Sequence, residues 1–426
     1  MTEVDESFAT ALAAEWHARP RLDLPPLFRA IHVVELGRGD RQKESRARFD
    51  EYCEAVGGGR PPAGARFHVV EDGDVIHRWE QHTECATHSL FLASDGLDPF
   101  TQSPLDRIEP EYGRTLQTRR FVAIQIEVVR PPAGDPTGYA LARSLIQADE
   151  LYGGSMSAGC ATVWSAFDLD EGGMTRLLVV AEPGHDERIS RLTQRLLDLE
   201  SYRFLSMAGL PVARFVMSAL SRFEPQMDEI MGSLADSASE LDEAAALERI
   251  TGLAAQVEHL AIGNAFRFAA TQAYARIVER RCEEVDEQTV GDHQRYTRFL
   301  LRSLVPAVRT CASAELRTQR LAEQTARAAE ILDTRVGVAR QQQNQSILGS
   351  VARSAEHQVK LQQAVEGFSI FAISYYAIGL LDYLAKSLEK LGLPIEPELA
   401  TGIAVPLAIG LVWWAVHRVQ SHATRE

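Results

Sequence analysis

The sequence predicts an α+β cytoplasmic domain with an antiparallel sheet, followed by a long helical stalk and a two-helix C-terminal transmembrane hairpin. Short segments with alternating apolar and polar residues fill the first part of the chain, as half-buried strands require. Apolar residues at helical spacing follow, and two apolar runs lie near the end of the sequence. We therefore expect the cytoplasmic domain over residues 1–185, the helical and stalk region over 186–366, and the hairpin over 367–420.

Composition and charge limit the class of protein. The chain has 426 residues, more than one hydrophobic core usually supports, and its 45% apolar and 24% charged residues are typical of a folded protein. The net charge of -15 argues against a nucleic-acid-binding surface, because such surfaces gather lysine and arginine to neutralise phosphates. The five cysteines are scattered without a CxxC pair, which favours a reducing compartment over a disulfide framework.

Strands are expected in the first part of the chain wherever alternation is regular. Asp72 and Gly73 form a hairpin signal, because this dipeptide suits a tight turn between antiparallel strands. A second turn is expected at residues 170–173, where two acidic residues precede two glycines. The strand-like segments are 28–36, 65–70, 75–92, 120–129, 159–169 and 175–182. We expect them to form an antiparallel sheet with flanking helices.

Helical spacing replaces alternation from Asp186 onward. Pro211 interrupts the first helix, and further helices are predicted over 237–257 and 261–284. Residues 312–367 contain no proline and little glycine, so a single helix of about 55 residues there would extend about 80 Å. We expect this stalk to pack against the preceding helices, against copies of itself, or both. A narrow apolar stripe serves that packing: Leu348, Val351, Ala355, Val359 and Val365.

Two apolar runs predict the transmembrane hairpin. Phe368–Leu381 carries no charge, and Val365–Leu381 gives about 17 residues, at the short end of what spans a bilayer. Leu399–Val416 is uncharged over about 18 residues, with Trp413 and Trp414 placed at the membrane interface as in an aromatic belt. A short polar connection makes the two spans antiparallel. The alternative is a pair of buried core helices.

The charge distribution predicts the inner membrane of a bacterial cell, with both termini in the cytoplasm. The N-terminus is acidic and lacks the apolar core of a signal peptide. The flanks of the two spans carry Arg353, Lys360, Arg418 and Arg425, against Lys386 and Lys390 between the spans. The expected partners are the lipid bilayer and other copies of this chain, with no nucleic acid.

A group of histidines and acids is the candidate metal site. If residues 75–92 form one regular strand, Glu80, His82, Glu84 and His88 share a face and offer the ligand types that a divalent metal such as zinc takes. The alternative is an ordinary solvated sheet face. The chain shows no nucleophile elbow, HExxH, phosphate loop or dinucleotide fingerprint, so we do not expect an enzyme.

The connection between the two spans contains Glu396 and Glu398. In a closed ring of subunits these side chains would form an acidic pore mouth that concentrates cations. In a monomer they would be part of an ordinary polar loop. The choice between the two depends on the oligomeric state.

Several strings then point to a family. HARP at 17–20, WEQHTE at 79–84, LESYRFLSMAGLP at 199–211 and the run from Gln343 to Leu380 together resemble the DUF3422 family of uncharacterised bacterial membrane-anchored proteins. The resemblance implies architecture and location, but no activity. Cys85 stands where a bulky aromatic residue is usual in that family.

The predicted layout is also similar to that of the CorA-type metal-ion transporters, although their Gly-Met-Asn signature is absent. Two functions follow as hypotheses. The first is a homo-oligomeric membrane protein that acts as a cation channel or transporter. The second is a membrane-tethered scaffold, or a sensor of a ligand or metal, in which the two spans serve only as an anchor.

Overall fold

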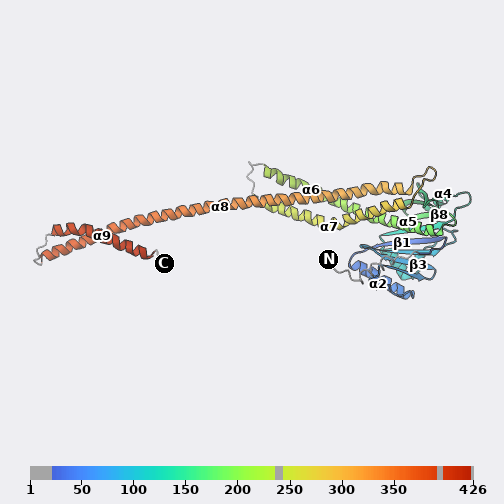
Figure 1. Ribbon diagram of the computed structural model, residues 1–426, viewed down its shortest axis with the longest axis horizontal. Helices are drawn as coiled ribbons and strands as arrows, with labels where there is room; N and C mark the ends of the chain where they lie inside the picture. The colour runs from blue at the N-terminus through green and yellow to red at the C-terminus, as the bar shows by residue number, and fades with distance from the viewer. Residues whose placement is uncertain (1–21, 236–242, 391–396, 424–426) are drawn as a thin grey trace, which may run out of the picture. The chain divides into compact units, whose positions relative to one another are not determined.

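The computed structural model describes residues 22–235, 243–390 and 397–423 (Figure 1). The chain divides into two compact units. The first unit comprises Met1–Leu241 and Glu248–Ala328, and the second comprises Asp242–Leu247 and Ala329–Glu426. The prediction of an N-terminal sheet domain followed by long helices is confirmed.

The first unit is built on an eight-stranded sheet in the order β2-β3-β4-β1-β5-β8-β7-β6. Two halves have related connectivity, because each follows the element order strand, helix, three strands, helix. In each half the first strand lies beside the last: β1 beside β4, and β5 beside β8. The strands are β1 (Phe28–Leu36), β2 (Phe67–Asp72), β3 (Val75–Gln81), β4 (Cys85–Ala93), β5 (Val122–Val129), β6 (Tyr152–Met156), β7 (Ala161–Leu169) and β8 (Thr175–Ala181).

The prediction of an antiparallel sheet is wrong at one pair of neighbours, so the sheet is mixed. β5 and β8 run parallel, whereas the other described pairs are antiparallel. After β5 the chain crosses through α4 (Tyr139–Ile146), and the β6-β7-β8 meander then returns in the direction of β5. Alternation could not reveal this, because parallel and antiparallel strands share the same two-residue period.

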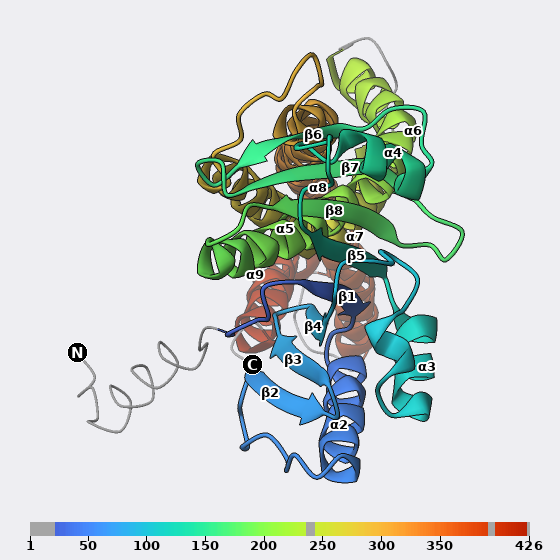
Figure 2. The same ribbon diagram turned by 90° about the vertical axis from the view of Figure 1, so that its right-hand side faces the viewer.

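Helices cover both faces of the sheet (Figure 2). On one face, α2 (Asp40–Ala55) and α3 (Pro110–Arg119) enclose a core that includes Phe49 and Trp79. On the other face, α5 (Asp186–Met207) contributes Leu192 and Leu196 to a second core, which Val278 and Tyr296 complete from the following helices. Those helices are α6 (Gly209–Ala235), α7 (Glu243–Glu284) and the first part of α8 (Tyr296–Lys390).

The break between α5 and α6 agrees with the predicted interruption, since Pro211 lies in the first turn of α6. Gly209 beside it permits a close approach of helices. A Cβ atom there would lie 2.2 Å from the Thr271 hydroxyl oxygen and 3.1 Å from the Cys311 sulfur. The predicted helix start at Ser237 lies outside the described residues. No break is present near residue 260, where α7 runs continuously.

The second unit contains the last part of α8 and the helix α9 (Pro397–Ala423). The helix predicted over 312–367 is longer than expected, because α8 accommodates Pro306 and extends to Lys390. Two helical stretches among the described residues are long and apolar enough to cross a membrane, Asp186–Ser233 and Tyr296–Leu384. The apolar part of α9, Gly402–Arg418, is shorter.

Candidate functional site

The structure separates the four candidate metal ligands. Residues 82–84 form a turn between β3 and β4, closed by the His82 backbone N–H, which donates to the Cys85 carbonyl oxygen at 2.8 Å. The segment is therefore a hairpin rather than one strand. Thr87 lies opposite Glu80 in the register and Trp79 opposite His88, so Glu80 and His88 belong to opposite faces of the sheet.

The two carboxylates of this set are already paired with arginines. Glu80 accepts a hydrogen bond from Arg78 at 2.5 Å, and the buried Glu84 accepts one from Arg267 of α7. Within residues 22–235, 243–390 and 397–423, no three histidine, cysteine, aspartate or glutamate side chains are grouped as a metal would need.

His88 belongs to a buried polar cluster under α2 and α3. The His77 Nε2 atom lies 3.2 Å from His88 Nδ1, and the Tyr112 hydroxyl lies 3.3 Å from the same nitrogen. Both histidines are fully buried. Burial and the neighbouring His88 lower the pKa of His77 well below its ordinary value, so His77 is neutral. The other ring nitrogen of His88, Nε2, faces Glu35.

Glu35 connects this cluster to the surface. Its Oε2 atom accepts a hydrogen bond from Ser45 at 2.5 Å, and it lies 3.2 Å from Arg48 and 3.8 Å from His88 Nε2. Burial by itself raises the pKa of Glu35, but the interactions with His88, Ser45 and Arg48 outweigh burial and lower it to about 2. Glu35 is therefore a carboxylate at neutral pH.

A cavity of about 280 Å³ opens beside Glu35. It is bounded by β1 and β4, by the first half of α2 and by the end of α3. Its lining combines one carboxylate with three guanidinium groups, two uncharged polar side chains and three residues without polar side chains: Glu35, Leu36, Gly37, Arg41, Gln42, Ser45, Arg48, Ala86 and Arg119. The Ser45 hydroxyl donates to a carboxylate rather than to a histidine. That arrangement does not form the nucleophile-and-base pair of a serine hydrolase.

A family model described as "Protein of unknown function (DUF3422)" matches residues 7–423. The chain belongs to the DUF3422 family. No curated protein matches the chain. The family match gives no support to the likeness with CorA-type transporters.

Two of the strings that resemble DUF3422 meet on the face of the sheet opposite the cavity. The His82 ring of WEQHTE lies 6.4 Å from the Tyr202 ring of LESYRFLSMAGLP, and Tyr202 stacks on Tyr274 of α7 at 5.4 Å. Glu84 pairs with Arg267 of the same helix. In this DUF3422 protein the two strings therefore hold α5 and α7 against the sheet. The HARP string lies outside the described residues.

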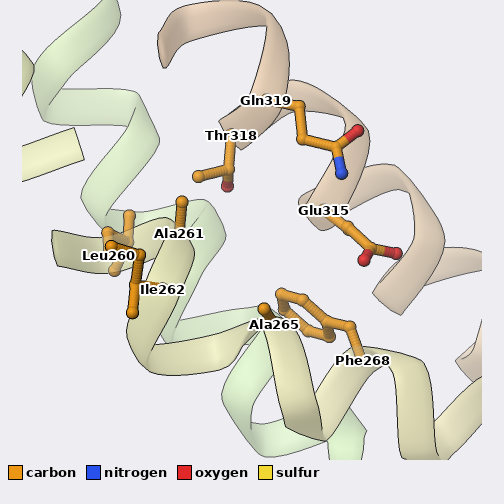
Figure 3. A pocket seen from close by; sticks show the side chains of 8 residues that line it. All are labelled: Leu260, Ala261, Ile262, Ala265, Phe268, Glu315, Thr318 and Gln319. Carbon is orange, nitrogen blue, oxygen red and sulfur yellow. The ribbon is translucent and has the colours of Figure 1, made fainter. Parts of the chain in front are cut away.

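A second, mainly apolar cavity of about 180 Å³ lies between α7 and α8 of the first unit (Figure 3). Side chains of Leu260, Ile262 and Phe268 line it from α7, and Glu315 and Thr318 lie across from them on α8. Glu315 accepts a hydrogen bond from Gln272 at 2.7 Å. This space has fewer charged groups than the cavity beside Glu35 and offers less for recognising a polar ligand.

The predicted membrane residues are placed as follows. Trp413 and Trp414 lie on α9, each 55% exposed. Glu396 lies outside the described residues, and for Glu398 the structure describes the helical backbone alone. A pore mouth built by these two glutamates stays a prediction.

The sequence singled out His88 but missed the residues around it. Glu35, Ser45, Arg48 and Tyr112 come from β1, α2 and α3, which are separated along the chain. One part of the pattern was readable: Arg41, Ser45 and Arg48 recur at four and three residues, as one face of a helix requires. The element that this face would meet could not be read from the sequence.

Proposed function

We propose that this DUF3422 protein is a membrane-tethered ligand-binding protein. Its apolar C-terminal helices anchor it in the inner membrane of a bacterial cell. The first unit, which contains the eight-stranded sheet and is called the sheet unit below, recognises a small ligand in the cytoplasm. The cavity beside Glu35 supports the second half of this proposal, because it gathers convergent polar and charged groups in one concave space.

One observation supports the first half of this proposal, the membrane anchor. The most apolar 18-residue window of Tyr296–Leu384 is only 6% buried, whereas the corresponding window of Asp186–Ser233 is 39% buried. Asp186–Ser233 contributes to the protein core, so its apolar residues have partners. Phe368 and Phe371 on α8 are each 76% exposed. Side chains this apolar need lipid or protein around them, because a soluble protein rarely exposes so large a contiguous apolar surface.

The same reasoning extends to α9 and supports a two-helix hairpin. Leu407 and Leu411 of α9 are 67% and 68% exposed. Gly402–Arg418 is short for a span, and Trp413 and Trp414 lie near its end, where an aromatic belt is usual. The basic residues on the flanks of the pair favour cytoplasmic termini.

Self-association is a further part of the proposal. Leu348 and Val351 on α8 are 67% and 57% exposed, and Val359 and Val365 continue the stripe at 54% and 58%. An apolar stripe of this kind suits packing against the same helix of another copy. Light scattering of the detergent-solubilised chain, with the detergent mass subtracted, measures this directly. A monomer would remove self-association from the proposal, together with the ring that cation transport needs.

Fractionation of cells that express the full chain tests the anchor. We expect the protein in the membrane fraction, resistant to alkaline carbonate and released by detergent. A double variant, Phe371→Arg with Ile373→Arg, should shift it toward the soluble or aggregated fraction, since each arginine in a span costs about 2.5–3.5 kcal/mol of insertion free energy. Leu97→Arg in the sheet unit, where Leu97 is 78% exposed, is the matched control. Release of the unaltered chain from membranes by alkaline carbonate would contradict the proposed anchor.

A further inference from the structure

The cavity beside Glu35 has an unusual concentration of arginine. Arg41 and Arg48 enter it from one face of α2, and Arg119, the last residue of α3, enters it from another element. Two helices that are far apart in the sequence thus deliver guanidinium groups to the same space. Three guanidinium groups around one space repel one another, and an anion placed between them offsets their charge.

The carboxylates near the cavity account for part of that charge. A carboxylate oxygen of Glu35 lies 3.2 Å from the Arg48 guanidinium group and offsets its charge. Arg119 lies 3.8 Å from Glu44, but their side chains are 53% and 60% exposed, and exposed pairs at this distance contribute little. Arg41 forms no ion pair within the part of the chain that the structure describes. Positive charge from Arg41 and Arg119 is left for a ligand.

The backbone around the cavity adds to the attraction for an anion. Gly37 lines the cavity, and α2 begins beyond it at Asp40. Gly39 precedes the helix and provides no side chain to bond the first N–H groups, at a φ of 57° that favours glycine. The first turn of α2 has no side-chain cap and contains one acid, Asp40, so its N–H groups and helix dipole add a modest attraction for an anion to that of the arginines.

We propose that this cavity binds a small anion that carries a phosphate group, held by Arg41 and Arg119 with Arg48 fixed beside them by Glu35. This inference rests on the ligand-binding half of the proposed function and names its ligand class. Guanidinium groups donate pairs of parallel N–H bonds that match phosphate oxygens. The volume of about 280 Å³ suits a compact ligand rather than a large cofactor.

Calorimetric titration of the detergent-solubilised full chain with inorganic phosphate tests this. We expect saturable binding at neutral pH, weakened at high salt as exposed charges are screened. The double variant Arg41→Gln with Arg119→Gln should bind at least about tenfold more weakly, because each substitution removes charge-assisted hydrogen bonds. Both side chains are exposed, so the variant should melt like the parent protein. Arg114→Gln, an exposed position on α3 outside the cavity lining, should bind phosphate normally.

Two results would overturn the inference: no saturable binding of phosphate by the parent chain, or equal binding by the double variant and the parent. The titration uses detergent-solubilised chain, so it does not depend on the membrane anchor. Phosphate binding can therefore be absent while the chain still fractionates with membranes, and phosphate can bind even if the chain does not fractionate with membranes. A lipid headgroup offers the same chemistry as a free phosphate. Nanodiscs with and without phosphatidic acid separate the sources, because phosphatidic acid should weaken binding of free phosphate if the headgroup occupies the cavity.

Discussion

Glu35 provides a quantitative test of the polar cluster under α2. Its folded-state pKa of about 2 lies below the ordinary value of 4.5, a difference of about 2.5. At about 1.36 kcal/mol for each pKa unit, ionised Glu35 stabilises the folded state by about 3 kcal/mol at neutral pH. Because the folded pKa is the lower of the two, this stabilisation is complete above the unfolded-state value and is lost as the pH falls toward 2.

The substitution Glu35→Gln removes this titration but keeps the size of the side chain. We expect the variant to be less stable than the parent by about 3 kcal/mol at pH 7, with the difference smaller by roughly 1.4 kcal/mol at pH 3.5. Denaturant unfolding of the full chain in a mild detergent, followed at both pH values, measures the two differences. Glu51→Gln, at an exposed position of α2, is the control. A difference between parent and variant that does not change with pH would refute the reasoning.

The contact between the two DUF3422-like strings and α7 makes two further predictions. Arg267→Met should destabilise the fold by about 3–5 kcal/mol, because it leaves the buried carboxylate of Glu84 without its charge partner; thermal unfolding would show it, and an unchanged melting temperature would contradict the contact. Adding Glu84→Gln to Arg267→Met should restore part of that loss, since the uncompensated charge is then gone; a double variant less stable than Arg267→Met alone would argue against this account.

Local pattern predicted much of the fold. The alternation at 28–36 corresponds to β1, and the Asp72-Gly73 signal marks the end of β2 and the turn that leads to β3. The mixed character of the sheet was missed because direction is set by the crossover through α4, which leaves no mark on the alternation of β5 or β8. The connectivity of the fold, rather than the local pattern, sets the direction of β8 relative to β5.

The candidate site was predicted less well, for two physical reasons. The turn at His82–Glu84 contains no glycine or proline, so the hairpin looked like a continuous strand and its acids were assigned to one face. Tertiary contacts then placed His88 with Glu35 from another strand, and Glu84 with Arg267 from a distant helix. No local spacing encodes either pair.

Labelling of single introduced cysteines in spheroplasts tests the central claim, that α8 crosses the membrane and leaves the sheet unit in the cytoplasm. The native cysteines are buried, which keeps the background low. A membrane-impermeant maleimide should label Lys386→Cys, beyond the first proposed span, in intact spheroplasts. Arg353→Cys, before that span, should react only after lysis. Labelling of both positions in the same compartment would contradict the hairpin.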